Sequence, residues 1–263
     1  MYHVNPKTGN PSQCKARKGN CPFGAVEDHF GSRLEALKHW EATNGLEVIP
    51  VAKKTIVLSD IDGTLVKSSL VLENAVELHE TGVIDLGDTP ARWKADMKNE
   101  ELVRELAEKY REALRGKGIS FVQAKKTVDR LLADQGNFYS TLQLLIDHKK
   151  NGAEVVLISG SPDFLVKPFA QRFGFKYHAS SYHRNSRGKF TGEITLMAGS
   201  TAKQEVIDNL GIHSYEDVIG MGDTSSDTPL LKSAKHSILV DPTEETVLKL
   251  QEQKVKIDKI VRS

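Results

Sequence analysis

Three short runs of apolar residues, each ending in polar residues, constrain the fold of this chain more than any other feature. The run TIVLS ends at Asp60, the run AEVVLI ends at Ser159, and the run DVIGM ends at Gly222 and Asp223. Helical sequence lies between the later runs and continues after them. Short runs rich in β-branched residues that alternate with helices are typical of parallel strands buried on both faces. We therefore predict an α/β fold, with a parallel sheet core and helices on both faces of the sheet.

A block of helical sequence separates the first run from the second. Its four amphipathic stretches each end at or near a glycine, a residue that commonly terminates helices. These stretches are residues 69–82, 99–116, 119–136 and 137–152. Because they interrupt the alternation of strands and helices, we interpret residues 68–150 as a helical cap inserted after the first strand. The sheet core then comprises residues 54–67 and 151–263, and residues 1–49 form a separate N-terminal module.

The rest of the core sequence continues the alternation. Residues 161–174 are predicted to form a helix with Pro162 in its first turn, where the missing N–H is tolerated. Residues 177–194 are predicted to form two strands around a turn at Ser186 to Gly188. Three further helices are expected at 200–211, 224–234 and 244–253, and a further strand at 236–241.

The first 49 residues differ in composition from the rest of the chain. The segment from His3 to Gly24 is rich in Pro, Gly, Asn and Lys and has no helical or strand period. This composition predicts either a compact loop structure or a flexible tail. Ser32 and Glu35 then form the capping box of a predicted helix that ends at Gly45. The whole segment resembles a short module found ahead of varied domains, largely in phage and actinobacterial proteins.

Four residues of this module are of the types that bind zinc: His3, Cys14, Cys21 and His29. Neutral imidazole and thiolate are preferred zinc ligands, in tetrahedral sets of four. A loop-rich segment of this size buries little apolar surface and would need a metal or a partner to become ordered. The spacing differs from that of common zinc fingers, in which the paired cysteines lie two to four residues apart. A structural zinc site and a metal-free module therefore both stay open.

Chemically useful side chains follow the apolar runs. In open α/β sheets, ligands bind beyond the carboxyl ends of the strands, so residues at these ends are candidates for one site. Carboxylates, a hydroxyl and an ammonium are available there, and the last comes from the start of a helix. These residues are Asp60, Asp62, Ser159, Lys203, Asp223 and Asp227.

This set of residues fits phosphoryl transfer through a covalent aspartate. Asp60 could attack phosphorus directly, since a carboxylate needs no deprotonation at neutral pH. Mg²⁺ binds through one or two carboxylates plus the substrate phosphate, and Asp60 and Asp223 suit that role. Asp62 could protonate the leaving oxygen and later deprotonate the attacking water. The phosphate would be held by the Ser159 hydroxyl, the Lys203 ammonium and backbone N–H groups. Those N–H groups would come from Gly63, Thr64 and Gly160.

Each of these residues also has a simpler interpretation when it is considered alone. Asp60 and Asp62 could form a turn, Ser159 could cap a helix, and Lys203 could be a solvated helix residue. Asp223 and Asp227 could favour the start of a helix through its dipole. Glycosyltransferases use Asp-x-Asp for metal binding but do not require this lysine, serine and aspartate set. Receiver domains phosphorylate an aspartate, but they have no cap insertion and no second aspartate that acts as acid/base. The joint placement of the residues favours phosphoryl transfer.

Four segments resemble, in order, the four motifs of the haloacid dehalogenase-like hydrolase superfamily: DIDGTL, LISGS, STAKQEV and GDTSSD. The helical block and the stretch RGKFTGEI are similar to its phosphoserine-phosphatase-like branch. The resemblance implies a Rossmann-like core, an Asp60 nucleophile, an Asp62 acid/base, and phosphate binding by Ser159 and Lys203. It also implies Mg²⁺ binding by Asp60, Asp223 and the backbone carbonyl of Asp62, with Asp227 beside Asp223 or contributing through water. Phosphoserine phosphatases carry a glutamate about nine residues after the nucleophile, where this chain has Ser69, so the substrate ester stays open.

Composition limits the partners that we expect. The net charge is +1, so no strong field directs the chain as a whole to nucleic acid or membrane. The sequence has no apolar run long enough to span a bilayer and no secretory signal, from which we expect a cytoplasmic protein acting on a small phosphorylated metabolite. An alternative function is recruitment, in which the N-terminal module binds a protein partner and the phosphatase fold is incidental.

Overall fold

The computed structural model describes residues 2–4, 11–13, 29–30, 54–88, 100–197 and 199–262. The chain divides into two compact units, Met1–Lys53 and Lys54–Ser263. Of the helices in these described ranges, none combines the length and apolar character needed to cross a membrane.

The described residues of the first unit contain a small antiparallel sheet. Strand β1 (Tyr2–Val4) pairs with β2 (Pro11–Gln13). The backbone of Tyr2 also exchanges two hydrogen bonds with that of Phe30, at 2.8 and 2.9 Å. The sequence has no strand period here, because each strand is only three residues long. The helix that we predict from Ser32 to Gly45 lies outside the described residues.

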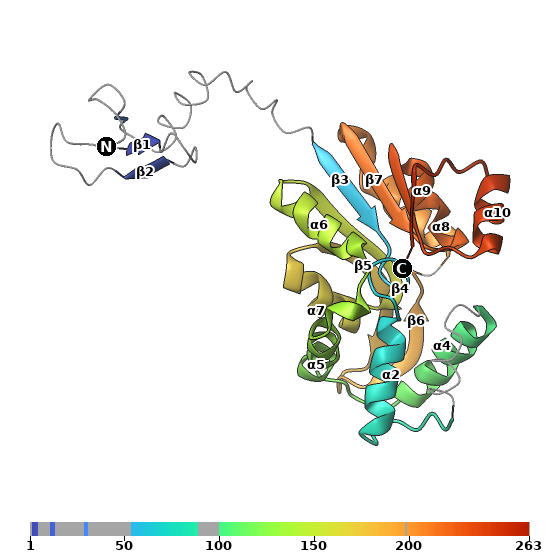
Figure 1. Ribbon diagram of the computed structural model, residues 1–263. Helices are drawn as coiled ribbons and strands as arrows, with labels where there is room; N and C mark the ends of the chain where they lie inside the picture. The colour runs from blue at the N-terminus through green and yellow to red at the C-terminus, as the bar shows by residue number, and fades with distance from the viewer. Residues whose placement is uncertain are drawn as a thin grey trace. The chain divides into compact units, whose positions relative to one another are not determined.

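The second unit is built on a seven-stranded sheet (Figure 1). Its spatial order is β6-β5-β4-β3-β7-β8-β9, and every neighbouring pair is parallel except β5 and β6, which are antiparallel. The strands are β3 (Thr55–Ser59), β4 (Glu154–Pro162), β5 (Lys176–Arg184), β6 (Phe190–Thr195), β7 (Asp217–Gly222), β8 (His236–Val240) and β9 (Lys259–Val261). The structure confirms the predicted α/β fold with its parallel-dominated, Rossmann-like core.

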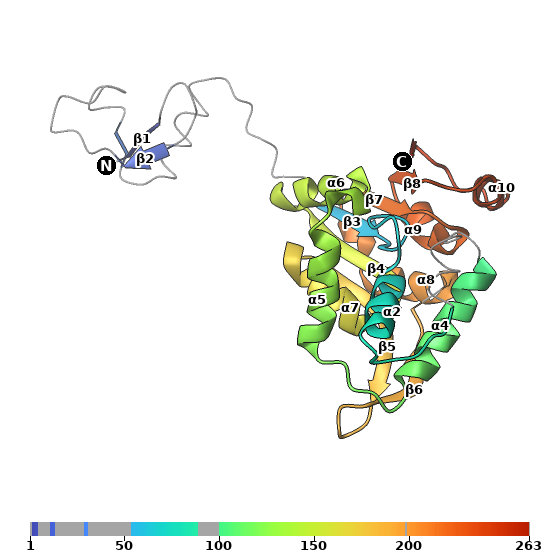
Figure 2. The ribbon, with the colours of Figure 1, turned by 60° about the horizontal axis from the view of Figure 1, so that its bottom comes forward.

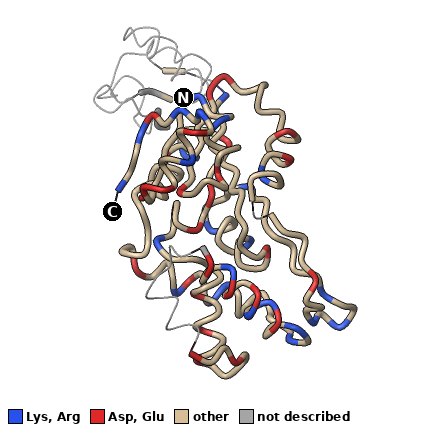
Figure 3. Tube along the Cα trace, turned by 90° about the vertical axis from the view of Figure 1, so that its right-hand side faces the viewer, with Lys and Arg blue, Asp and Glu red and all other residues tan. Residues whose placement is uncertain are grey.

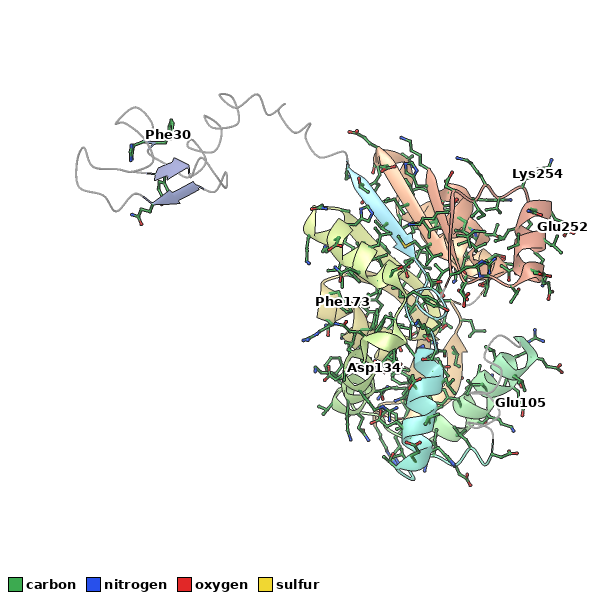
Figure 4. All side chains as sticks on the ribbon, in the orientation of Figure 1. Phe30, Glu105, Asp134, Phe173, Glu252 and Lys254 are labelled. Atoms are coloured by element: carbon green, nitrogen blue, oxygen red, sulfur yellow. The ribbon has the colours of Figure 1, made fainter. Side chains whose placement is uncertain are left out.

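Helices cover both faces of this sheet, because successive residues of a strand point to opposite faces. On one face, Val57 and Leu157 pack in a cluster with apolar residues of α6 (Ser140–Lys150) and α7 (Asp163–Phe173). Phe173, at the end of α7, packs its ring 5.4 Å from that of Phe169 (Figure 4). On the other face, the cluster contains residues of α8 (Ser200–Asn209) and α9 (Thr228–Ser233). These opposite clusters explain why the strand sequences are apolar throughout.

The segment between β3 and β4 supplies a helical cap. Its helices are α2 (Leu70–Glu80), α4 (Glu100–Leu114) and α5 (Phe121–Leu132). In Figure 1 they lie on the side to which the β3 arrow points. A buried polar chain joins the three helices, since the Tyr110 hydroxyl donates to Asn74 at 2.5 Å and Asn74 donates to Thr127 at 2.8 Å. These three helices follow the first strand, as predicted, whereas α6, which also belongs to the predicted cap at 68–150, packs against β4 of the sheet.

Some local predictions need correction. Pro162 does not lie in the first turn of α7 but ends β4 and caps the helix, with an extended ψ of 137°. An N-cap residue keeps a non-helical backbone, which explains this one-residue difference. The predicted helix at 224–234 is divided into the 3-10 turn η4 (Ser225–Asp227) and α9. Strand β9 was not predicted, because a run as short as KIV carries no period.

A glycine on β7 leads to a prediction about stability. A Cβ atom on Gly220 would lie 2.2 Å from the Leu230 carbonyl oxygen, where α9 packs against the sheet. Neither backbone can move away easily, so we expect Gly220→Ala to lower the free energy of unfolding by about 3 kcal/mol. Gly118→Ala is the matched control, because its Cβ would lie at an ordinary 3.7 Å from the nearest atom. Urea unfolding measures both, and equal midpoints for the two variants would contradict the prediction.

Candidate active site

The candidate site lies at the carboxyl ends of β3, β4 and β7, in the centre of the sheet. Ser59 is in register with Leu157 on β4 and with Met221 on β7, so β3 and β7 end near the same level and β4 continues beyond them to Pro162. Asp60 follows β3, Asp223 follows β7, and the last residues of β4 include Ser159. Side chains that are far apart in the sequence therefore meet, as the parallel sheet requires.

Lys203 joins two of the aspartates. Its ammonium lies 2.9 Å from an Asp60 oxygen and 2.6 Å from an Asp227 oxygen. All three residues are buried, and Lys203 is only 3% exposed. Burial alone would lower the pKa of Lys203, but Asp227 and Asp60 raise it above its usual range. The lysine is therefore a fixed positive charge held against Asp60.

Three carboxylates form a group suited to a hard cation. Oxygens of Asp60, Asp223 and Asp227 all lie within 4.8 Å of one another. Burial, followed by repulsion from Asp227 and Asp60, raises the pKa of Asp223 well above its usual range. A Cβ on Gly63 would lie 2.2 Å from an Asp223 oxygen, so only glycine permits this approach. An all-oxygen donor set with one lysine for three carboxylates fits Mg²⁺, which binds through carboxylates.

Neighbouring groups shift the pKa of Asp60 in opposite directions. Burial is the largest influence and raises its pKa, Lys203 lowers it, and the neighbouring Asp227 and Asp62 raise it, so that the pKa of Asp60 lies at about 7. The two oxygens of Asp227 serve different partners, because one pairs with Lys203 and the other accepts the N–H groups of Asp223 and Thr224 at 3.1 and 3.0 Å. Asp227 therefore holds the loop after β7 against the lysine, besides belonging to the carboxylate group.

Asp62 is held apart from that group. One of its oxygens accepts the N–H of Leu70, the first residue of α2, at 2.7 Å. The other accepts the hydroxyl of Ser161 at 2.6 Å and that of Ser159 at 3.4 Å. Burial raises the pKa of Asp62, and the hydrogen bond from Ser161 opposes this shift. A carboxyl of raised pKa between cap and core is suited to donating and accepting a proton.

The predicted phosphate-binding residues surround the same edge. The Ser159 hydroxyl accepts the N–H of Ser161 at 3.1 Å, and Gly160 lies between these two serines. The N–H of Gly63 donates to Val66 at 2.8 Å and that of Thr64 to Ile61 at 3.3 Å. The Thr64 hydroxyl donates to Asp223 at 3.0 Å. A phosphate role for these groups stays a prediction.

Other residues at this edge had been given no role. Ser161 was visible in the sequence beside Ser159, but its bond to Asp62 depends on the fold. Asp241 follows β8 as Asp60 follows β3, so the same strand-end signal was available. Its φ is 38°, which is rare for a residue other than glycine. It accepts the Tyr139 hydroxyl at 3.1 Å, and burial, together with Asp241 and Asp223, raises the pKa of Tyr139 to about 12. Nothing in the sequence around Tyr139 indicated this contact.

The proposed zinc ligands belong to the first unit. Cys14 and Cys21 lie outside the described residues. His3 lies opposite Ser12 in the β1–β2 pair, and His29 precedes Phe30, whose backbone pairs with that of Tyr2. The zinc site stays a prediction.

Comparisons with known proteins agree with this geometry. Residues 57–232 match the family model of the haloacid dehalogenase-like hydrolases. A probable phosphatase of Mycobacterium tuberculosis is 27% identical over 108 residues, which are 40% of this chain and 38% of that protein. The chain therefore spans about two fifths of the length of this relative.

Two solved structures are similar in fold. A protein of unknown function from Bordetella pertussis superposes with a TM-score of 0.60 at 18% identity, covering 80% of this chain and 99% of that one. A phospho-aspartyl intermediate analogue of phosphoserine phosphatase superposes with a TM-score of 0.55 at 20% identity, covering 80% and 93%. With the family match over most of the second unit, these findings show that the chain belongs to the haloacid dehalogenase-like hydrolase family.

Proposed function

We propose that this protein is a Mg²⁺-dependent phosphomonoester hydrolase that works through a phospho-Asp60 intermediate. The observation that carries the proposal is the environment of Asp60. This carboxylate touches Lys203 and also belongs to the group of three carboxylates within 4.8 Å. A lysine and a cation on either side of one carboxylate would allow an anionic nucleophile to approach an anionic phosphate.

The reaction proceeds in two displacements. An Asp60 oxygen attacks phosphorus, the bond between phosphorus and the ester oxygen breaks, and Asp62 gives its proton to the leaving alcohol. Water then attacks the phosphorus of the acyl phosphate, and Asp62 takes its proton. The bond between phosphorus and Asp60 breaks, which releases inorganic phosphate and restores the carboxylate. The position of Asp62, bonded to Ser161 but outside the carboxylate group, supports this division of roles.

The chain's own residues prepare the site for this chemistry. Asp60, Asp223 and Asp227, with the backbone carbonyl of Asp62, would hold the Mg²⁺. When bound, the ion would offset the repulsion between the carboxylates and the phosphate and favour the ionised form of Asp60. Lys203 fixes the Asp60 carboxylate, and the Ser159 hydroxyl lies on the Asp62 side, where equatorial phosphate oxygens would bind.

The substrate that we propose is a small phosphorylated metabolite. One similar solved structure is a substrate complex of a phosphoserine phosphatase. Here Ser69, at the position of the amino-group-binding glutamate of those enzymes, caps α2 by accepting the N–H of Leu72 at 3.2 Å. Its neutral hydroxyl gives an ammonium group no counter-ion. We therefore expect a phosphate panel to show better substrates than phosphoserine.

Metal removal tests the magnesium part of the proposal. We expect EDTA to lower phosphate release from p-nitrophenyl phosphate at least about hundredfold, because charge neutralisation at the carboxylate group is lost. Added Mg²⁺ should restore turnover, whereas Ca²⁺ should restore much less, since it favours larger and more flexible coordination. Phosphate release and circular dichroism are measured on the same samples, so that unfolding is detected. Full turnover in EDTA with native circular dichroism would contradict the metal requirement.

A further inference from the structure

Two segments distant in the sequence form one continuous surface on the second unit. The first segment is residues 116–126, which connect α4 to α5 and include the start of α5. The second segment is residues 183–190, which include the turn between β5 and β6 and the adjoining strand ends. The N–H of Gly116 donates to the Phe190 carbonyl at 2.9 Å, and the N–H of Phe190 donates to the Lys117 carbonyl at 2.9 Å. Figure 2 shows the turn beside the connection, at the bottom of the molecule. We call these two segments the basic–apolar surface.

The basic–apolar surface carries cations without acidic residues of its own. Its basic residues are Lys117, Lys125, Lys126, Arg184, Arg187 and Lys189, and neither segment contains Asp or Glu. Lys125 pairs with Asp129 and Lys126 approaches Glu77. For the exposed Lys117, Arg187 and Lys189, no carboxylate of the described residues lies within ion-pair distance. Figure 3 shows this concentration of basic residues at the tip of the β5–β6 turn.

Arg184 holds the β5–β6 turn, and the cations on it, in a fixed position. Its guanidinium donates to the Ile119 carbonyl at 2.8 Å and lies 4.0 Å from the centre of the Phe190 ring. Asn185 accepts the N–H groups of Arg187 and Lys189 at 2.9 and 3.1 Å. The turn is thereby fixed both internally and to the connection before α5.

Two neighbouring apolar side chains project from the same surface. Phe121 is 48% exposed and Val122 is 75% exposed, and they are the first two residues of α5. The Ser120–Gln123 capping box holds the start of this helix in place. The helix packs through its other face, with Ala124, Val128 and Leu131 buried. Lys125 and Lys126 follow Phe121 and Val122 by one helical turn, so these exposed apolar side chains lie beside cations, as is typical of interaction sites.

We propose that the basic–apolar surface docks onto an anionic phospholipid membrane. The cations would face the lipid phosphates, and Phe121 and Val122 would enter the boundary between headgroups and acyl chains. This mode of binding needs no spanning helix, and it depends on local charge rather than on the net charge of +1. Single-stranded nucleic acid is the weaker match, because Val122 has no ring for a base to stack on and Phe121 would be a single platform.

Vesicle sedimentation of the full-length protein tests this proposal. The probes are phosphatidylcholine vesicles with and without phosphatidylserine, and oligouridylate RNA. Binding is expected only with phosphatidylserine and should weaken as salt increases. The variant Lys117→Gln/Arg187→Gln/Lys189→Gln should bind about a hundredfold more weakly, at about fivefold per cation. The variant Phe121→Ser/Val122→Ser should bind at least about tenfold more weakly.

Matched controls distinguish a loss of binding at this surface from general effects of substitution. Leu248 on α10 (Glu244–Glu252) is 59% exposed, and Leu248→Ser should leave vesicle binding unchanged. Turnover of p-nitrophenyl phosphate without vesicles should be the same in all variants, which shows that they are folded and makes the test independent of the proposed reaction. Equal vesicle binding by the Phe121/Val122 variant and the parent protein would overturn the proposal. So would RNA binding stronger than vesicle binding, or no binding to anionic vesicles at all.

Discussion

Replacing Asp60 by asparagine is expected to lower the turnover of a phosphate monoester by about ten-thousandfold or more. An amide of the same shape cannot attack phosphorus, so the covalent route is lost and only binding remains. This factor corresponds to about 5 kcal/mol of transition-state stabilisation. The measurement is kcat/KM for the best substrate of the panel, at saturating Mg²⁺. Because Asp227 still pairs with Lys203 at 2.6 Å, we expect the variant to remain folded.

A chemical readout makes the Asp60 result specific. Acid quenching with radiolabelled substrate should leave a label on the parent protein that hydroxylamine removes, as expected of an acyl phosphate, and no label on Asp60→Asn. Asp147→Asn, on the exposed side of α6, is the matched control and should retain full turnover and labelling. If Asp60→Asn retained a tenth of the parent turnover, Asp60 would not be the nucleophile.

Replacing Lys203 by methionine is expected to cost both stability and activity. Methionine is of similar length, but it leaves Asp60 and Asp227 buried without the ammonium that lies 2.9 and 2.6 Å from them. Removing one partner of a buried ionic group costs about 3–5 kcal/mol. We expect a loss of this size in urea unfolding without Mg²⁺. Turnover should fall by about a thousandfold, because the Asp60 carboxylate loses its fixed counter-charge.

A second substitution distinguishes lost charge pairing from lost packing. In the double variant Lys203→Met/Asp227→Asn, one of the two uncompensated carboxylates is gone, so part of the lost stability should return. Lys232→Met, at an exposed position on α9, should leave the unfolding midpoint almost unchanged. An unchanged midpoint for Lys203→Met would mean that the buried ion pairs contribute nothing to folding. A loss that Asp227→Asn does not reduce would indicate a packing effect instead.

The sequence was sufficient to predict which residues stand at the ends of strands. A strand such as TIVLS can be recognised from neighbouring residues in the sequence. The polar residue that follows the strand is located at the same time. Since parallel strands end at one edge of a sheet, Asp60, Ser159 and Asp223 could be assigned to one site without coordinates. Lys203 could be included in this set from its place near the start of a helix, but only the family resemblance favoured a role in the site over a solvated lysine.

The sequence was not sufficient to predict contacts made across the chain. The bond from Ser161 to Asp62 joins β4 to the segment after β3, and Lys203 bridges Asp60 and Asp227, which are far apart in the chain. The order of the strands in the sheet and the pairing of β9 with β8 likewise depend on which strands lie side by side. The separation of Asp62 from the three clustered carboxylates therefore became visible only in the structure.

By itself, the sequence determined the type of the longer elements of the second unit and the chemical groups that follow its strands, because periodicity and turn chemistry act between neighbouring residues. The tertiary structure alone decided that Lys203 is shared by Asp60 and Asp227. It also decided that the β5–β6 turn is bonded to the connection before α5, through Arg184 and the Ile119 carbonyl. Such contacts depend on the packing of distant segments, which no local pattern in the chain specifies.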